Sequence, residues 1–288
     1  MNQRGTIELV EAAILEHHHL DGEQHILRVQ ADDIAASARP GSFAHITCDR
    51  ALPMRRPISI MRVDDKQGWV EFLYKAVGEG TRRLAEHQEG ELISILGPIG
   101  RPFEVSATTR RPLLIGGGVG MPPMIFLADA LRAQNDLQPF VILGSEVPFP
   151  FVARPSTIMV PGIPDGVIAA SPLLEDWGIA SRLTSTRGYA GCFDGYVTDL
   201  ARGWLDALDD DARGEVEVFA CGPHPMLEAV AQLARDYDLP CQVSMEEFMA
   251  CGVGGCAGCV VEVQTETGVA MKRVCVDGPV FEAGEVFG

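Results

Sequence analysis

The stretch "ACGVGGCAGC" at residues 250–259 holds three cysteines and four glycines, and a fourth cysteine follows in "KRVCVDGPVF" at residues 272–281. Zinc ribbons usually pair two Cys-x2-Cys units, so a first gap of four residues argues against zinc. Gaps of four and two residues and a distant fourth cysteine are the plant-type arrangement for a [2Fe–2S] cluster. The spacing therefore predicts a [2Fe–2S] cluster, with structural zinc as the alternative, on four ligands: Cys251, Cys256, Cys259 and Cys275.

The glycines of the same stretch fit that chemistry. A loop that curls around bridging sulfides must bring its backbone N–H groups toward the sulfurs, and glycine permits both the close approach and any positive φ. We expect this role for Gly252, Gly254, Gly255 and Gly258.

Composition limits the classes of function. The chain has 288 residues, enough for two or three domains, and 40 acidic against 23 basic side chains give a net charge of −17. So acidic a surface disfavours nucleic acid and anionic lipid as partners. Neither a signal peptide nor a membrane span is evident, which predicts a cytoplasmic protein. The remaining cysteines are scattered rather than spaced as a disulfide framework: Cys48, Cys192, Cys221 and Cys241.

The pattern along the chain predicts three domains. Residues 1–106 contain short segments of alternating polarity broken by Gly, Pro and Asp, which predicts an antiparallel β-barrel. Residues 107–240 alternate strands with helices, which predicts a parallel sheet, although residues 145–200 are rich in loops and receive no assignment. Residues 241–288 form the small cysteine-bearing domain. The fold class is thus multidomain, β and α/β.

A flavin motif is predicted in the barrel. In "RRPISI" the Arg56 guanidinium can bind a phosphate, and Ser59 or nearby N–H groups can reach a flavin ring nitrogen. Further on, Gly78, Gly80 and Thr81 begin a helical pattern whose free N–H groups attract a pyrophosphate. Either piece alone is weak, but their order within a barrel favours FAD.

A nucleotide motif is predicted in the parallel sheet. "LLIGGGVGMPPM" leads from a buried strand through a glycine turn into a helix, a geometry suited to a nucleotide phosphate. In "FACGPHPML" a strand ends at Cys221, and Gly222 and Pro223 turn at the carboxyl edge of the sheet, where such sheets bind ligands. The simplest role for Cys221 is that of a small buried apolar residue.

Together these motifs resemble the ferredoxin–NAD(P) reductase superfamily. Within it, the C-terminal "MACGVGGCAGC…KRVCVDGPVF" resembles the electron-transfer subunits of NAD-linked dihydroorotate dehydrogenases. The resemblance implies that the four clustered cysteines ligate the [2Fe–2S] cluster and that FAD contacts Arg56, Pro57, Ile58, Ser59, Leu73, Tyr74, Lys75, Gly80 and Thr81. It also implies that NAD is bordered by Gly116, Gly117, Gly118, Gly120, Cys221, Gly222 and Pro223, with Cys221 as the candidate catalytic residue.

Electron counting gives the expected function. NAD exchanges two electrons as a hydride, a [2Fe–2S] cluster exchanges one at a time, and a flavin can do both. The resemblance implies an oxidoreductase of pyrimidine biosynthesis in a hetero-oligomer, in which an FMN-containing subunit oxidises dihydroorotate and electrons pass through the cluster and FAD to NAD. No second barrel is evident, so this chain is expected to be the electron-transfer half alone.

Alternatives remain at this stage. The same cofactors would suit a flavin/iron–sulfur subunit of a ferredoxin:NADP oxidoreductase or a sulfide dehydrogenase. A redox-sensing regulator that uses the cluster or zinc as a switch is the alternative outside enzymes. His17, His18 and His19 resemble a metal tract but are predicted to form a solvated turn between strands. Glu146, after a predicted strand, could accept a ribose hydroxyl, but an ordinary surface role is favoured.

Overall fold

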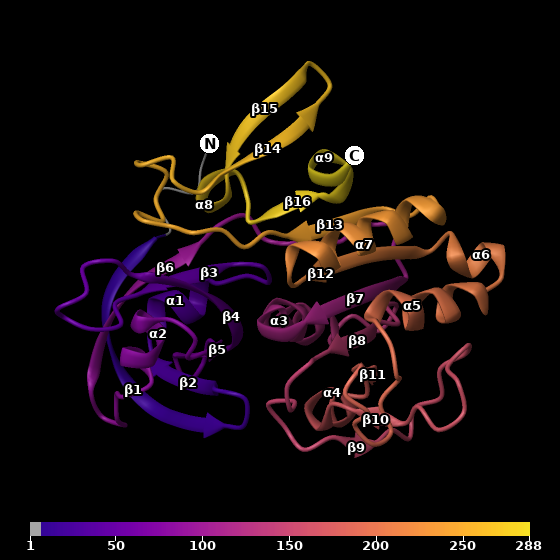
Figure 1. Ribbon diagram of the computed structural model, residues 1–288, viewed down its shortest axis with the longest axis horizontal. Coiled ribbons are helices and arrows are strands. Elements are labelled where there is room, and N and C mark those ends of the chain that lie inside the picture. The colour runs from indigo at the N-terminus through magenta and orange to yellow at the C-terminus, as the bar shows by residue number, and fades with distance from the viewer. Residues whose placement is uncertain (1–6) are drawn as a thin grey trace. The chain divides into compact units, whose positions relative to one another are not determined.

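The computed structural model describes residues 7–288 and divides into two compact units. The barrel unit comprises the chain up to Phe103 and Ser244–Phe281, and the sheet unit comprises Glu104–Val243 and Glu282–Gly288. Figure 1 labels the elements of both units. Residues 1–6 of the predicted barrel domain lie outside the described residues.

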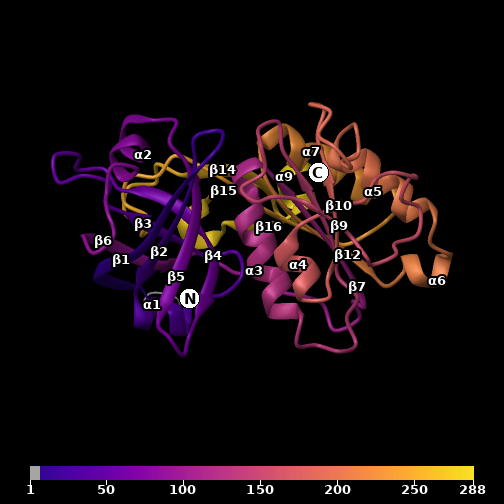
Figure 2. The same cartoon turned by 90° about the horizontal axis from the view of Figure 1, so that it is seen from below.

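Six antiparallel strands close the barrel of the first unit in the order β1-β2-β5-β4-β3-β6. Figure 2 shows these strands curving around a common interior. Pairing of the first strand with the last closes the ring and leaves no free edge. The strands are β1 (Glu8–Leu20), β2 (Gln24–Gln30), β3 (Phe43–Ile46), β4 (Arg56–Asp64), β5 (Trp69–Lys75) and β6 (Leu92–Ile99).

Alternating apolar side chains fill the barrel, because successive residues of a strand point to opposite faces. Leu27 and Val29 of β2, with Val70 and Phe72 of β5, are fully buried. Two short helices accompany the strands, α1 (Asp32–Ser37) and α2 (Glu79–Leu84).

The cysteine-bearing segment belongs to the barrel unit. After the cysteine loop, β14 (Val260–Thr265) and β15 (Gly268–Arg273) form an antiparallel hairpin, and α8 (Val274–Asp277) follows. The chain then ends with β16 (Val280–Glu282) and α9 (Ala283–Phe287).

The main sheet has six strands in the order β11-β8-β7-β12-β13-β16, of which β11, β8, β7 and β12 run parallel. Helix α3 packs against β7, β8 and β12, while α5 packs against β8 and α7, and α7 against β12. The strands are β7 (Arg111–Gly117), β8 (Phe140–Gly144), β11 (Ala180–Thr184), β12 (Val216–Cys221) and β13 (Cys241–Ser244). The helices are η1 (Gly118–Gly120), α3 (Met121–Leu131), α4 (Pro172–Asp176), α5 (Val197–Asp206), α6 (Asp210–Arg213) and α7 (His224–Asp236).

The predicted fold class is confirmed: an antiparallel barrel, a parallel sheet and a C-terminal cysteine-rich segment are all present. The unassigned residues 145–200 contain β11 of the main sheet and a two-stranded ladder of β9 (Arg154–Pro155) and β10 (Ala169–Ala170). The predicted turn at His17–His19 is wrong. These residues continue β1 and pair with β2, from His17 opposite Leu27 to His19 opposite His25.

Candidate functional site

The four clustered cysteines form two close pairs within the barrel unit. Cys259 Sγ lies 3.3 Å from Cys275 Sγ, and both side chains are buried. Cys251 and Cys256 interact through their side chains, the first half-buried and the second exposed. The fold thus brings the last cysteine of the motif, which follows the β14–β15 hairpin, back to the loop that holds the first three.

Backbone N–H groups of the loop point at two of these sulfurs. Gly255 N–H donates to Cys251 Sγ at 3.3 Å, and Gly258 N–H donates to Cys256 Sγ at 3.4 Å. Gly252 and Gly254 have φ of 67° and 81°, a region that disfavours side chains. The glycines therefore have two roles: Gly252 and Gly254 adopt positive φ, and Gly255 and Gly258 donate to sulfur.

Cys251 and Cys275 differ in acidity. Burial opposes ionisation of Cys251, but N–H donors of the loop and the Cys256 side chain outweigh it and lower the pKa of Cys251 to about 7. Burial, followed by the neighbouring Cys259, raises the pKa of Cys275 to about 12. Since thiolates are the metal ligands, the loop favours ligation at Cys251, while Cys275 needs the charge of a metal to ionise.

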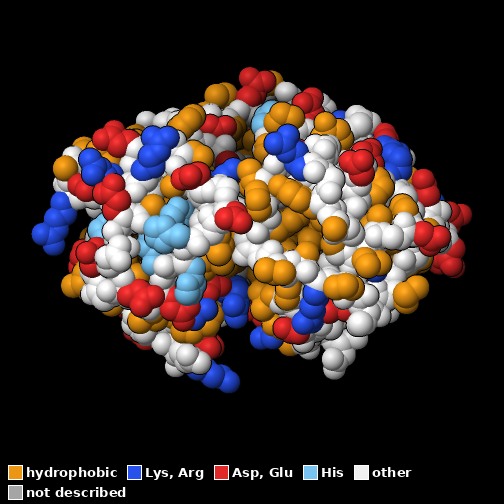
Figure 3. Space-filling model, turned by 60° about the horizontal axis from the view of Figure 1, so that its bottom comes forward, with side chains coloured by type: hydrophobic (Ala, Val, Ile, Leu, Met, Phe, Trp, Pro, Cys, Tyr) orange, Lys and Arg blue, Asp and Glu red, His pale blue; other side chains and the backbone are white. Residues whose placement is uncertain are grey.

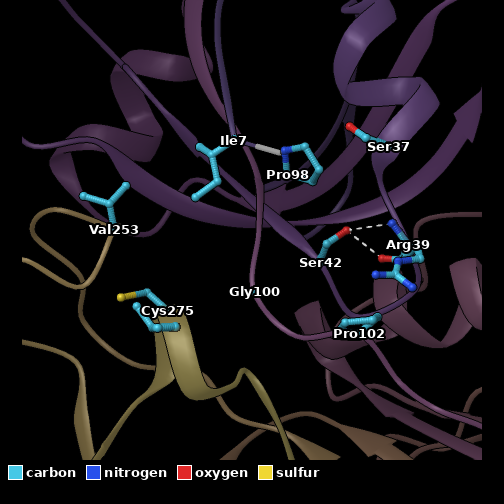
Figure 4. Close-up of a pocket in the computed structure, with 10 residues that line it drawn as sticks. Ile7, Ser37, Arg39, Ser42, Pro98, Gly100, Pro102, Val253 and Cys275 are labelled. Carbon is cyan, nitrogen blue, oxygen red and sulfur yellow. Dashed lines mark hydrogen bonds between the residues drawn. The ribbon is translucent and has the colours of Figure 1, made fainter. Parts of the chain in front are cut away.

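A pocket of the barrel unit opens beside this loop (Figure 4), with a cavity of about 90 Å³. Val253 and Cys275 line one side, and the Cys275 sulfur points to the side on which Val253 lies. On the opposite side Ser42 Oγ donates to the Arg39 carbonyl and accepts from the Arg39 N–H. The cysteine loop therefore faces residues of the barrel across an open space.

The predicted phosphate-binding residues of the flavin motif meet at one end of the barrel. Arg56 begins β4, and its guanidinium packs so closely over Gly80 that a Cβ there would lie 2.7 Å from Nε. Gly78 caps α2, and its N–H donates to Thr81 Oγ1 at 3.1 Å. A cationic fork next to a side-chain-free backbone is the arrangement that a pyrophosphate requires.

The rest of the flavin motif is carried by neighbouring strands. Pro57, Ile58 and Ser59 pair with β3, and Leu73, Tyr74 and Lys75 end β5. The Tyr74 side chain is buried and bonded to His17, so only its backbone is available to a flavin.

His45 is a residue that the motif search missed. It lies opposite Pro57 in the β3–β4 ladder, and its ring packs under the cysteine loop, where a Cβ on Gly252 would lie 2.8 Å from Nδ1. The His45 ring is fully buried, and neither of its nitrogens has a hydrogen-bond partner among residues 7–288. Burial, followed by the nearby charges of Arg55 and Arg56, lowers the pKa of His45 to about 4. A neutral imidazole thus separates the cysteine loop from the flavin strand. The one signal in the sequence was a histidine within the apolar strand "FAHI".

The predicted nucleotide residues come together in the sheet unit. β7 and β12 are parallel neighbours that pair Gly116 with Cys221, so both glycine-bearing turns leave the same sheet edge. A Cβ on Gly120 would lie 2.2 Å from the Cys221 carbonyl, and one on Gly117 would lie 2.4 Å from Met226 Sδ. Close packing therefore explains why Gly117 and Gly120 carry no side chain.

Gly118 behaves differently. Its φ is 56°, and open space lies where its side chain would be. This leaves its backbone accessible to a ligand. The Cys221 side chain is buried, as a small apolar residue would be, while Gly222 and Pro223 lead into α7. The Glu146 carboxylate accepts from Thr186 Oγ1 at 2.6 Å, so its nearest partner is within the protein.

Comparison with known proteins identifies the family that shares these features. The model for the "iron-sulfur cluster binding domain of dihydroorotate dehydrogenase B" matches residues 246–287, the segment that contains all four cysteines. The chain is 33% identical over 251 residues to the electron-transfer subunit of dihydroorotate dehydrogenase B (NAD+) from Caldanaerobacter subterraneus, covering 86% of each protein. It is 35% identical over 256 residues to the subunit of the same name from Geobacillus kaustophilus, again covering 86% of each.

The chain belongs to the dihydroorotate dehydrogenase B electron-transfer subunit family. It is therefore an electron-transfer subunit of an oxidoreductase, and its C-terminal segment is an iron–sulfur cluster-binding domain, as the cysteine spacing predicted. A solved structure of an NADH-dependent reduced ferredoxin–NADP oxidoreductase has the same fold, with a TM-score of 0.78, 26% identity and coverage of 96% of this chain and 90% of that one. Among residues 7–288, no helix is long and apolar enough to cross a membrane.

Proposed function

We propose that this chain carries one FAD and one [2Fe–2S] cluster and passes electrons between NAD and an FMN-containing subunit that oxidises dihydroorotate. The observation that carries the proposal is the pairing of the four motif cysteines within the barrel unit, next to the strands of the flavin motif. A flavin exchanges electrons singly or in pairs, which is the chemistry needed between a hydride carrier and a one-electron cluster.

The cysteine geometry fits the cluster. Two irons with four protein sulfurs take two sulfurs each. Cys251 with Cys256 would hold one iron and Cys259 with Cys275 the other, since these are the pairs that the fold brings together. The N–H groups of Gly255 and Gly258 stabilise the negative charge on the first pair.

The barrel residues fit FAD. Arg56 would bind the pyrophosphate over Gly80 and Thr81, and Pro57 to Ser59 with Leu73 to Lys75 would hold the flavin ring system. His45 is fully buried, pairs with Pro57 across the β3–β4 ladder and packs under Gly252, so a single residue links the flavin strand to the cluster loop.

The sheet residues fit NAD. Gly118 would offer its backbone to the phosphates. Gly120 lets the turn approach the Cys221 backbone of β12, whereas Gly116 and Gly117 make room for Leu143 of β8 and Met226 of α7. Gly222 and Pro223 would border the nicotinamide, next to the buried Cys221. We accordingly assign FAD to residues 1–106, NAD to 107–240 and the cluster to 241–288.

The partner would dock on the cluster loop. Phe248 is 94% exposed and Val253 is 43% exposed, and large apolar side chains so exposed often mark protein interfaces. Ala250 and Ala257 are exposed as well, whereas Met249 is buried. A dehydrogenase subunit placed there would receive or deliver electrons directly at the cluster.

Reconstitution with the FMN subunit tests the proposal. Val253→Glu should leave NADH-driven dye reduction through FAD intact and abolish NAD-dependent orotate formation. Val152→Glu, at an 89% exposed valine of the sheet unit, is the matched control and should keep both activities. Full orotate formation by the Val253 variant would show that electrons leave by another face.

The similarity to the ferredoxin–NADP oxidoreductase structure supports a second candidate, with reduced ferredoxin in place of the FMN subunit. Co-purification separates the two candidates. The main proposal requires a bound subunit that releases FMN and forms orotate, and a partner without flavin would favour the second.

A further inference from the structure

Three histidines of the barrel meet at one end of β1 and β2, beside Tyr74 of the flavin motif, which stacks on His25. His17 and His19 lie two residues apart on β1, and His25 pairs with His19 across the ladder. The ring centroids of His19 and His25 are 4.4 Å apart, and those of His17 and His19 are 5.3 Å apart. One ligand nitrogen from each ring lies within 4.8 Å of the other two. Figure 3 shows histidine side chains gathered on the surface in pale blue.

His25 provides a second, independent observation. Its side chain is 5% exposed, and its Nδ1 has no hydrogen-bond partner among residues 7–288. Buried polar atoms are nearly always satisfied, so an unpartnered nitrogen on a ring that contacts both His17 and His19 supports a ligand at this cluster. Burial, followed by the neighbouring histidines, lowers the pKa of His25 to about 4, so the ring is neutral at pH 7, as metal binding requires.

His17 is already held as metal-bound histidines are. Its Nδ1 lies 2.9 Å from the His87 carbonyl, which can only accept, so Nδ1 carries the proton. The lone pair is then on Nε2, where it accepts from the Tyr74 hydroxyl at 2.9 Å. An Nδ1–H bond to a backbone carbonyl is the usual support that orients a ligating imidazole.

We propose that His17, His19 and His25 bind one divalent transition-metal ion, for which zinc is the natural probe. Three imidazoles and one further ligand form a common tetrahedral zinc site, with metal–nitrogen distances of about 2.0–2.1 Å. The ion would replace the Tyr74 hydroxyl on His17 Nε2, and that hydroxyl or a water would complete the site. His19 is exposed and free to rotate, so it can close the remaining gap to the other two rings.

The chain offers a matched control. His18 lies between two proposed ligands in the sequence but on the opposite face of β1, where its Nε2 contacts Glu16 at 3.0 Å. His18→Ala removes an exposed imidazole from the same tract and leaves the proposed site intact. His19→Ala removes an exposed ligand with little risk to folding, whereas His25→Gln changes a buried one.

The test is a calorimetric titration with zinc chloride of tag-free, chelator-treated protein that retains its flavin and iron. We expect one zinc per chain beyond the iron count, with affinity unchanged in His18→Ala and weakened at least about 100-fold in His19→Ala and His25→Gln. Wild-type protein that binds no zinc at 100 µM (roughly the weakest affinity expected of three imidazoles) would overturn the proposal. Equal weakening by His18→Ala, unchanged affinity in His19→Ala, or binding only after loss of flavin or iron would overturn it as well.

Discussion

Gly252 of the cysteine loop provides the sharpest structural prediction. Its φ of 67° lies in the left-handed region, and a Cβ there would lie 2.8 Å from Nδ1 of the buried His45 ring. The backbone conformation alone costs an alanine roughly 1–2 kcal/mol, a factor of about 5 to 30 in the population of the native loop. The contact with His45 adds to this, because a packed ring cannot retreat without displacing its neighbours.

We therefore expect Gly252→Ala to lose its cluster at least about fivefold faster than wild type. The assay is the decay of cluster absorption, with iron and acid-labile sulfide counts, during incubation with an iron chelator. Gly255→Ala is the matched control, since Gly255 has open space at its Cβ position, no positive φ, and an N–H to Cys251 that alanine retains.

A double variant separates the two causes. His45→Ala in the Gly252→Ala background removes the steric contact but not the cost of the positive φ, so it should recover only part of the lost stability. Equal rates of cluster loss in Gly252→Ala and Gly255→Ala would refute this account of the loop.

Three further predictions concern other parts of the chain. Arg56→Ala should weaken FAD binding by roughly 1.5–3 kcal/mol, measured as flavin release on dilution, because a charge-assisted phosphate contact is lost; release of FMN rather than FAD would show that the flavin motif is misassigned. Glu71→Gln should lower the free energy of unfolding by roughly 3 kcal/mol in urea titrations, because the Glu71 side chain is 5% exposed and pairs with Arg28 at 2.7 Å. An unchanged urea midpoint of unfolding would mean that this ion pair contributes nothing to stability. In protein stripped of iron, iodoacetamide should modify Cys251 far faster than Cys275 at pH 7, since their pKa values are about 7 and about 12. The Cys251 rate should fall about tenfold per unit below pH 7 and level off above it, and equal rates by mass spectrometry would contradict the loop's effect on acidity.

Features that depend on the local spacing of residues could be predicted from the sequence. Six barrel strands follow from alternating polarity, and the parallel sheet follows from strands that alternate with helices. The four cysteines and the glycine-to-helix turns were found because their chemistry requires fixed residue types at fixed gaps.

Features that depend on register were beyond the sequence. His45 reaches the cysteine loop only because of its face on β3, and Gly252 meets it from about 200 residues further along the chain. His17–His19 look like a polar turn because nothing local reveals that β1 extends to Leu20 or that His25 lies opposite. Two-residue strands such as β9 and β10 leave no periodic signal to detect.

The central claim, that FAD is the necessary step between nicotinamide and cluster, can be tested in the isolated chain. Anaerobic protein is mixed with NADH, or photoreduced and mixed with NAD+, while the cluster is followed by electron paramagnetic resonance and NADH by its absorbance. The account predicts electron exchange between cluster and nicotinamide in the downhill direction, its loss when FAD is removed with the cluster intact, and its recovery when FAD is restored. Exchange at an unchanged rate in flavin-free protein, or no exchange in either direction with both cofactors bound, would contradict it.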